Sequence, residues 1–332
     1  MRGAAGTDTV AAAVAGDRPA FDALAARHRR ELQVHCYRML GSFEDAEDQV
    51  QETLLRAWHR RATFRGRASY RAWLYGIATN ACLDLLARRP RPRPGGSGGP
   101  SEVPWLQPFP DRLLEPPASA AEEPDAVVVE RETIELAFLV ALQHLPPRQR
   151  AVFLLRDVLG WSAKATAALA EATEASVNSA LQRARATLRA RLPGDRLEWA
   201  APSRDPSAGE RQALKRYVDA HASADVAAVA DLLREDVRFT MPPQRRLYEG
   251  RDALLDFFQR QVFGPEGPGE FRLLPTRANR QPAAAHYVRT AATPRFRALA
   301  LDVLRVEGAQ IAEITTFEPR LFAAFGLPGS LE

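Results

Sequence analysis

The chain has 332 residues, a hydrophobic content of 46% and a formal net charge of +4 at pH 7. This length exceeds that of one small domain and allows two or three, and the apolar content is enough to build packed cores. The apolar run over residues 10–15 is too short for a signal peptide and no stretch approaches a membrane span, so we expect a cytoplasmic protein with no membrane partner.

The cysteine content and the net charge restrict the kinds of binding site that the chain can form. Cys36 and Cys82 are the only cysteines and have no CxxC or paired-histidine neighbours, so we expect neither a disulfide framework nor a zinc site. We expect no metal and no cofactor. The positive charge permits nucleic-acid binding, but a GC-rich genome also produces an arginine-rich chain, so the placement of the arginines matters more than their number.

An acidic helix is predicted after Gly41, with Ser42 in the position of a cap. Apolar side chains at intervals of four predict one buried face, formed by Ala46, Val50, Leu54 and Trp58. Acidic side chains share another face: Asp45, Asp48 and Glu52. This second face suits a basic protein partner.

A stretch rich in arginine and aromatic residues follows, from Arg60 to Arg89. A helix is predicted from Ser69, with the buried side chains Leu74, Ile77, Ala78, Ala81 and Leu85. Its other side would present Arg71, Tyr75, Thr79, Asn80 and Arg88. Trp58 and Trp73 fall on or near buried stripes and are assigned to the core. The remaining aromatic residues suit base stacking and the arginines suit phosphate contacts.

Composition divides the chain at two breaks. Residues 90–124 are dominated by proline and glycine and predict an extended linker, and a second break covers residues 192–206. We therefore predict domains at residues 17–89, 125–192 and 208–325.

The middle domain shows the pattern of a helix-turn-helix. Pro146 and Pro147 open a predicted helix over residues 148–158, which stops at Gly160, and a short helix follows Ser162. In the next helix the buried stripe is Val177, Leu181, Ala184 and Leu188. The outward side chains carry amide, hydroxyl and guanidinium groups that suit the major groove, although an ordinary three-helix bundle would show the same periodicity.

The third part mixes helices with strands. Helical patterns cover residues 210–222, 226–233 and 252–263. Alternating runs predict strands at residues 237–241, 271–276, 284–289, 296–306 and 311–317. Helices packed on one curved antiparallel sheet make an α+β domain.

Residues 21–192 resemble the sigma-70 family of RNA polymerase sigma factors in its compact extracytoplasmic-function form. Residues 45–58 resemble its region 2.2, residues 73–84 its region 2.4 and residues 176–185 its region 4.2. Three motifs in the expected order make a specific match. Asn178 and Ala180 stand where basic residues are frequent in the family, so the −35 sequence cannot be taken from other members.

The resemblance implies three binding surfaces. A coiled coil of the largest polymerase subunit would meet Asp45, Asp48, Gln49, Glu52 and Leu55, and the flap of the second subunit would be a further polymerase contact. The −10 promoter element would meet Phe64, Arg65, Arg67, Tyr70, Arg71, Tyr75, Thr79, Asn80 and Arg88, with the loop at residues 64–67 holding a flipped base. The −35 element would meet Ser176, Asn178, Ser179, Gln182, Arg183 and Arg185.

Segments 236–243 and 248–254 resemble the SnoaL-like group of nuclear-transport-factor-like domains, which form a cone with an apolar pocket and include isomerases and hydrolases. The resemblance implies an apolar pocket, and the candidate residues for a small apolar ligand are Tyr217, Tyr248 and His286. Because a long flexible linker joins the two DNA-binding parts, we expect this fused domain to regulate their activity in cis. Catalytic candidates would be Tyr217, His221, Asp236, Arg238, Tyr248, His286, Asp302 and Glu313. No spacing among them predicts a reaction, so we assign no catalytic residue and expect no enzyme.

The predicted architecture is multidomain: two all-α domains, sigma region 2 and the region 4 helix-turn-helix, and a C-terminal α+β cone. The predicted function is promoter-directed initiation by core RNA polymerase, tuned in cis by the third domain. Two alternatives stay open. One is a helix-turn-helix regulator that binds DNA alone, and the other is a SnoaL-type isomerase or hydrolase fused to a DNA-binding module.

Overall fold

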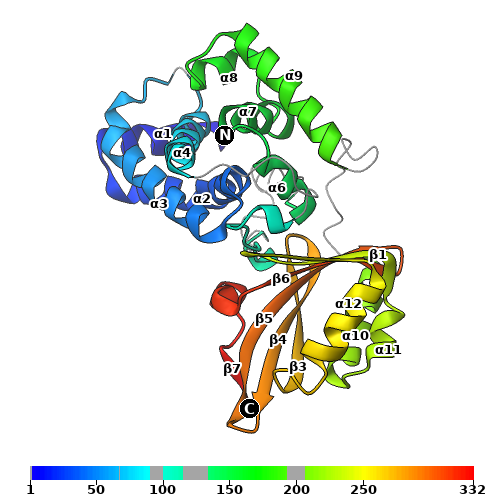
Figure 1. The fold of residues 1–332 in the computed structure, drawn as a ribbon. Helices are drawn as coiled ribbons and strands as arrows, with labels where there is room; N and C mark the ends of the chain where they lie inside the picture. Colours follow the sequence, from blue (N-terminus) through cyan, green and yellow to red (C-terminus); the bar gives the residue numbers. More distant parts are fainter. Residues whose placement is uncertain (1, 67, 90–99, 115–133, 193–205) are drawn as a thin grey trace. The chain divides into compact units, whose positions relative to one another are not determined.

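The computed structural model describes residues 2–66, 68–89, 100–114, 134–192 and 206–332, and its chain divides into two compact units. The first, here called the helical unit, comprises Met1–Pro94, Pro116–Ile134 and Phe138–Ala200. The second, the C-terminal unit, comprises Gly95–Glu115, Glu135–Ala137 and Ala201–Glu332. Figure 1 shows the ribbon of both units.

The first half of the helical unit contains α1 (Arg2–Ala15), α2 (Arg18–Leu40), α3 (Phe43–Arg60) and α4 (Tyr70–Arg88). Local chemistry sets their starts: the side chains of Asp17, Ser42 and Ser69 each accept a backbone N–H of the first turn. The predicted starts after Ser42 and Ser69 are confirmed. The buried face of α3 differs from the prediction, since it consists of Phe43, Ala46, Val50, Thr53 and Ala57.

The second half contains α6 (Leu136–Gln143), α7 (Pro147–Phe153), α8 (Ala163–Leu169) and α9 (Glu174–Arg191), with a π-helical turn at Leu154–Val158. Ser162 and Thr173 cap α8 and α9. Gly160, at φ 69°, supplies the left-handed backbone that ends the preceding helical stretch. The predicted helix-turn-helix pattern is therefore present, and Val177, Leu181, Ala184 and Leu188 form the buried stripe of α9.

Arg150 of α7 joins the two halves of the helical unit. Its guanidinium donates to the carbonyl of Met39 at the end of α2, to Gln143 Oε1 at 2.6 Å and to the Leu145 carbonyl at 3.1 Å. Burial lowers the pKa of this side chain to about 9. A buried guanidinium that lacks hydrogen-bond acceptors lowers the free energy of unfolding. The oxygens that accept from Arg150 therefore stabilise the packing of α7 against α2.

The C-terminal unit is a curved sheet with helices α10, α11 and α12 on one side (Figure 1). The helices are α10 (Ala208–Ala222), α11 (Val226–Ala230) and α12 (Arg251–Phe257), and α12 continues into a π-helical turn at Phe258–Val262. The strands are β1 (Leu233–Met241), β2 (Gln244–Glu249), β3 (Glu270–Ala278), β4 (Gln281–Thr290), β5 (Thr293–Glu307), β6 (Gln310–Phe317) and β7 (Ser330–Leu331).

The strand order is β2-β1-β6-β5-β4-β3, and β7 pairs with β5. The pair β1 and β6 is parallel and the other pairs are antiparallel, so the predicted antiparallel sheet is corrected to a mixed one. The five predicted strands are present. Sequence periodicity missed β2 and β7, and the predicted helix over residues 226–233 ends at Ala230 because Leu233 already pairs with Ile311.

Residues 100–114 correct the prediction of an extended linker. They contain 3-10 helices at Pro100–Glu102 and Asp111–Leu113. Their buried apolar side chains include Val103, Leu106, Phe109 and Leu114. By its contacts this segment belongs to the C-terminal unit. Its apolar residues therefore pack into that unit, although they stand within a proline-rich stretch.

The tip of the β3–β4 hairpin holds this segment. The Phe109 N–H donates to Asn279 Oδ1 at 2.8 Å, and the Asn279 N–H donates to the Phe109 carbonyl at 2.9 Å. The Arg280 N–H donates to Asp111 Oδ1 at 2.7 Å. We call these three hydrogen bonds the linker clasp. Asn279 and Arg280 both have positive φ, 57° and 60°, as a two-residue hairpin turn requires.

No helix in the described part of the chain is long and apolar enough to cross a membrane.

Candidate polymerase, promoter and ligand surfaces

The outward face of α3 combines acidic groups with an exposed leucine. Asp48 is exposed, while Gln49 and Glu52 are half-buried. Leu55 is 53% exposed, which singles it out among the large hydrophobic side chains of the described residues. Two of the acidic side chains have intramolecular partners, since Asp45 pairs with Arg89 and Glu52 accepts from Arg56 Nε at 2.6 Å. An apolar side chain beside carboxylates resembles the composition of a protein-binding surface.

The predicted −10 residues separate into exposed and buried groups. Arg65, Asn80 and Arg88 are exposed. Phe64, Tyr70 and Trp73 form an aromatic cluster with ring centroids 5.4–5.6 Å apart, in which Tyr70 is buried. Trp73 is only half-buried and lies beside Phe64. Arg67 lies outside the described residues.

Tyr75 and Thr79 do not lie on the outer side of α4, which corrects the prediction. Both are buried against α2, where Tyr75 donates to Glu31 Oε2 at 3.2 Å and Thr79 Oγ1 lies 2.9 Å from His35 Nε2. Arg71 is half-buried and donates to the same Glu31 oxygen at 2.6 Å. These polar groups can be buried because α2 supplies their hydrogen-bond partners.

A cavity of about 690 Å³ separates the predicted −10 surface from α8 within the helical unit. Its lining includes Phe64, Arg65 and Asn80 from one side and Trp161 and Lys164 from the other. The ring of Trp161 lies 5.7 Å from that of Tyr75. In this arrangement α8 covers part of the surface that the sequence assigns to DNA.

The outward face of α9 carries the predicted −35 residues. Five of them are exposed: Ser176, Asn178, Ser179, Gln182 and Arg183. Arg185 is half-buried and forms a bidentate pair with Asp157, with both N–O distances at 2.7 Å. The hydrogen bonds that Arg185 donates to Asp157 raise the pKa of Arg185 above its usual value. Arg185 is thus oriented by Asp157, whereas the other five project freely to solvent.

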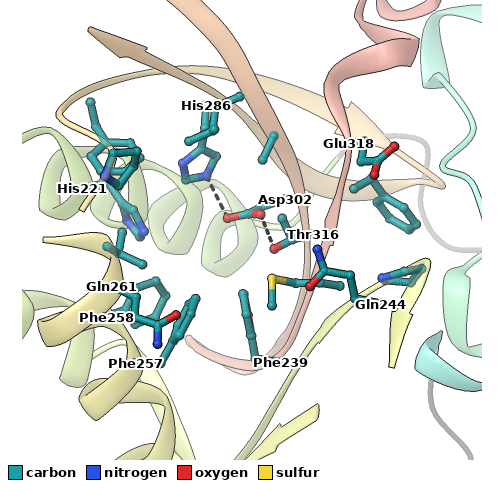
Figure 2. Close-up of a pocket in the computed structure, with 18 of the residues that line it drawn as sticks. His221, Phe239, Gln244, Phe257, Phe258, Gln261, His286, Asp302, Thr316 and Glu318 are labelled. Atoms are coloured by element: carbon teal, nitrogen blue, oxygen red, sulfur yellow. Dashed lines mark hydrogen bonds and ion pairs between the residues drawn. The ribbon is translucent and has the colours of Figure 1, made fainter. Parts of the chain in front are cut away.

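The C-terminal unit contains a cavity of about 320 Å³ between the helices and the sheet (Figure 2). Phenylalanine side chains form much of its wall: Phe239, Phe257, Phe258 and Phe271. His221 and His286 lie on one side, and Gln244 and Glu318 on the other. The volume is at the lower end of the range for small-molecule sites, about 300–1,000 Å³.

Asp302 is the centre of a buried hydrogen-bond network in the wall of this cavity. Its Oδ2 accepts from Tyr217 Oη at 2.7 Å and lies 2.7 Å from His286 Nε2, and its Oδ1 accepts from Thr316 at 2.6 Å. Burial by itself would raise the pKa of Asp302. The charge of His286 and the hydrogen bonds outweigh burial and lower it to about 2.

His221 stands next to this network on α10. Its Nδ1 lies 2.9 Å from the Tyr217 carbonyl, and its ring is 5.2 Å from that of His286. Burial, and secondarily the charge of His286, lowers the pKa of His221 to about 3. The imidazole is therefore neutral in the folded chain at neutral pH.

We expect the C-terminal unit to lose stability as the pH falls below 6.5, because the unfolded His221 then takes a proton that the folded ring accepts only near pH 3. Each pH unit in this window should cost about 1.4 kcal/mol of unfolding free energy. Calorimetry of the full chain between pH 7 and 4 measures the slope. His221→Phe should reduce it, and His59→Phe, at an exposed site, should not. Equal slopes for wild type and His221→Phe would contradict this expectation.

The other sequence candidates lie elsewhere. Tyr217 is fully buried behind Asp302, and Tyr248 packs on Phe257 at 4.7 Å, so neither is among the residues that line the cavity. Three charged candidates form ion pairs away from the cavity lining: Asp236 with Arg234, Arg238 with Glu249, and Glu313 with Arg305. The sequence did not indicate the phenylalanine wall. The four-residue spacing of Tyr217 and His221 on one helix was a usable signal for their proximity.

Three family models match the chain in order. They are Sigma-70 region 2 over residues 24–91, Sigma-70 region 4 over residues 135–188 and a SnoaL-like domain over residues 214–314.

Curated relatives match over most of the chain. The ECF RNA polymerase sigma factor SigG of Mycobacterium tuberculosis is 42% identical over 324 residues, which covers 94% of this chain and 85% of that protein. SigJ of the same organism is 31% identical over 259 residues, which covers 76% of this chain and 74% of SigJ. The crystal structure of SigJ superposes with a TM-score of 0.59 at 23% identity, covering 93% of this chain and 99% of the SigJ chain, so the two share a fold.

Proposed function

The chain belongs to the ECF group of RNA polymerase sigma factors. On this basis we propose which of its surfaces bind core polymerase and which bind promoter DNA. Sigma factors bind RNA polymerase core and direct it to promoter DNA. In our proposal α3 binds core polymerase, the end of α3 with α4 engages the −10 element, α9 reads the −35 element, and the SnoaL-like domain adjusts these activities from within the same chain.

The exposed Leu55 beside Asp48 and Glu52 carries the assignment of α3. An exposed leucine costs solubility unless a partner covers it, and the neighbouring carboxylates suit a basic surface. Reconstitution tests the whole proposal: the chain added to core polymerase should give transcription from a defined start site. Binding of the chain to an operator without any association with core would contradict it.

The −10 assignment rests on the groups that remain exposed near α4. Asn80, Arg65 and Arg88 are accessible, and the half-buried Phe64 and Trp73 lie together in one aromatic cluster. Arginine suits phosphates, and an aromatic ring suits a base that has left the stack. Four predicted residues hold this surface in position through contacts with other parts of the helical unit. Tyr70 packs in the aromatic cluster, and the hydrogen bonds to α2 come from Arg71, Tyr75 and Thr79. Since α8 covers part of the surface, promoter binding requires α8 to move away from α4.

The −35 assignment makes a prediction for α9. Replacing Gln182 or Arg183 by alanine should weaken promoter binding by holoenzyme by about 1–3 kcal/mol, because a side chain that reads a base edge contributes that much discrimination. Gln182→Ala should also relax sequence preference at one −35 position, measured on a panel of single-base promoter variants. Arg189→Ala, exposed on the same helix near its end, is the control. An effect of Arg189→Ala equal to those of the other two would contradict base reading.

The C-terminal domain is proposed as a regulatory module that acts through the linker clasp. The segment it holds lies between region 2 and region 4 in the sequence, so a clasp on this segment limits how the two DNA-binding regions can be spaced. The cavity suits a small apolar ligand, with His286 in its wall. We assign no catalysis to it: Asp302 has a lowered pKa and is surrounded by Tyr217, Thr316 and His286, which makes it a poor general base.

A further inference from the structure

His221 presents an unused hydrogen-bond acceptor to the cavity of the C-terminal unit. The Tyr217 carbonyl can only accept, so Nδ1 carries the proton and Nε2 carries a lone pair. The side chain is 1% exposed, and no described residue forms a hydrogen bond with Nε2. A buried acceptor without a donor costs free energy, so a molecule that supplies the donor gains affinity by relieving this cost.

The surroundings of Nε2 favour a ligand with an apolar body. Besides Tyr217 and His286, the rings around the imidazole are those of Phe258 at 5.5 Å and Phe263 at 5.2 Å, both in edge-on geometry. A water molecule is held in a buried site by two to four polar partners, and on the side of Phe258 and Phe263 the aromatic edges supply none. A flat ring system fits such walls because aromatic pairs prefer edge-to-face or offset contacts.

The charges around the cavity favour a neutral ligand. The lining holds two carboxylates: Glu318 is exposed to solvent, and the buried Asp302 already has Tyr217, Thr316 and His286 as partners. A charged ligand would compete with these contacts, a cation for Asp302 and an anion for His286. His221 itself is neutral at neutral pH, so its Nε2 remains an acceptor.

We propose that this cavity binds a neutral aromatic molecule whose single hydroxyl group donates to His221 Nε2, that is, a compound of the phenol class. The proposal rests on the assignment of the cavity to a small apolar ligand, made above, and names the chemical class of that ligand. Figure 2 shows His221 directed toward the space between the phenylalanine side chains and His286, where such a hydroxyl group would lie.

Calorimetric titration of the full chain with 2-naphthol and with naphthalene tests the proposal, since the two probes differ only in the hydroxyl group. Wild type should bind 2-naphthol more tightly than naphthalene. In His221→Phe the ratio of the two affinities should fall by about tenfold, because the hydroxyl group is then buried without an acceptor. His221→Gln, which restores an acceptor, should recover part of the ratio. His59→Phe, at an exposed site in the helical unit, should leave it unchanged.

The outcomes test the role of His221 and the binding of an aromatic ligand separately. An unchanged ratio in a folded His221→Phe chain overturns the role of His221 and leaves the apolar pocket in place. Failure of wild type to bind either probe up to its solubility limit overturns the ligand proposal altogether. Both readouts are independent of polymerase, so a failure of the transcription assay is distinguished from a failure of ligand binding.

Discussion

Replacing Asp48 and Glu52 together by arginine should abolish binding of the chain to core polymerase and, with it, promoter-specific transcription. Both carboxylates lie on the outward face of α3 next to the exposed Leu55. Like charges placed opposite each other at an interface cost several kcal/mol, and two reversals against a basic surface exceed what an interface of ordinary affinity tolerates. Binding is measured by fluorescence anisotropy of the labelled chain titrated with core polymerase.

The fold should survive this double change. Glu52 contributes only a surface pair with Arg56 one turn along the helix, worth about 0.3–0.5 kcal/mol. Asp8→Arg with Asp22→Arg is the matched control, since both side chains are exposed acidic groups of the helical unit outside α3. Equal loss of core binding in the control would show that total charge, and not the α3 surface, is responsible. Retained binding in the α3 variant would refute the assignment.

Local signals in the sequence were sufficient for the helix starts and for the alternation of the main strands. Ser42, Ser69, Ser162 and Thr173 cap helices through their own side chains, and a cap needs only residues two or three positions away. The alternating runs of the third part likewise follow from the two-residue period of a strand. Both kinds of signal are contained in a short window of sequence.

Tyr75 and Thr79 show that local sequence signals do not reveal contacts between distant helices. The helical period placed both side chains opposite the predicted buried stripe, yet each finds a partner on α2 that lies 44 positions away in the sequence. A polar side chain can be buried when a distant element supplies its partner, and a helical period does not reveal that partner. By contrast, the tryptophans assigned to the core, Trp58 and Trp73, are half-buried. Fewer of the predicted −10 residues are therefore exposed than the sequence indicated.

The candidate ligand site shows the same limit. Tyr217, His221, His286 and Asp302 were all identified as polar residues of the third domain, but they come from α10, β4 and β5, and only Tyr217 and His221 are linked by a helical spacing. Their convergence depends on the strand order β5-β4-β3 and on the packing of α10 across it. The linker clasp is a still more distant contact, since Phe109 and Asn279 lie 170 positions apart.

Opening the linker clasp should alter promoter output as much as removing the C-terminal domain does. Asp111→Ala with Asn279→Ala removes the side-chain acceptors for the Arg280 and Phe109 N–H groups, and a buried donor left without an acceptor costs about 1–3 kcal/mol. If the domain acts by holding this segment, then the double variant and a chain ending at Arg204 should change transcription in the same direction, each by about threefold or more. Transcription is measured with reconstituted holoenzyme on one promoter.

Combination of the two changes gives the sharper test. In the chain that ends at Arg204, Asp111→Ala should have no further effect, because its partner Arg280 is already absent. The control is Thr290→Ala with Thr293→Ala, which removes an exposed hydroxyl pair at 2.8 Å from the turn at the other end of β4. If the truncated chain changes output while the clasp variant behaves like wild type, the domain acts through another surface. If neither changes output, regulation in cis is excluded on that promoter, and the clasp is then a contact that serves folding alone.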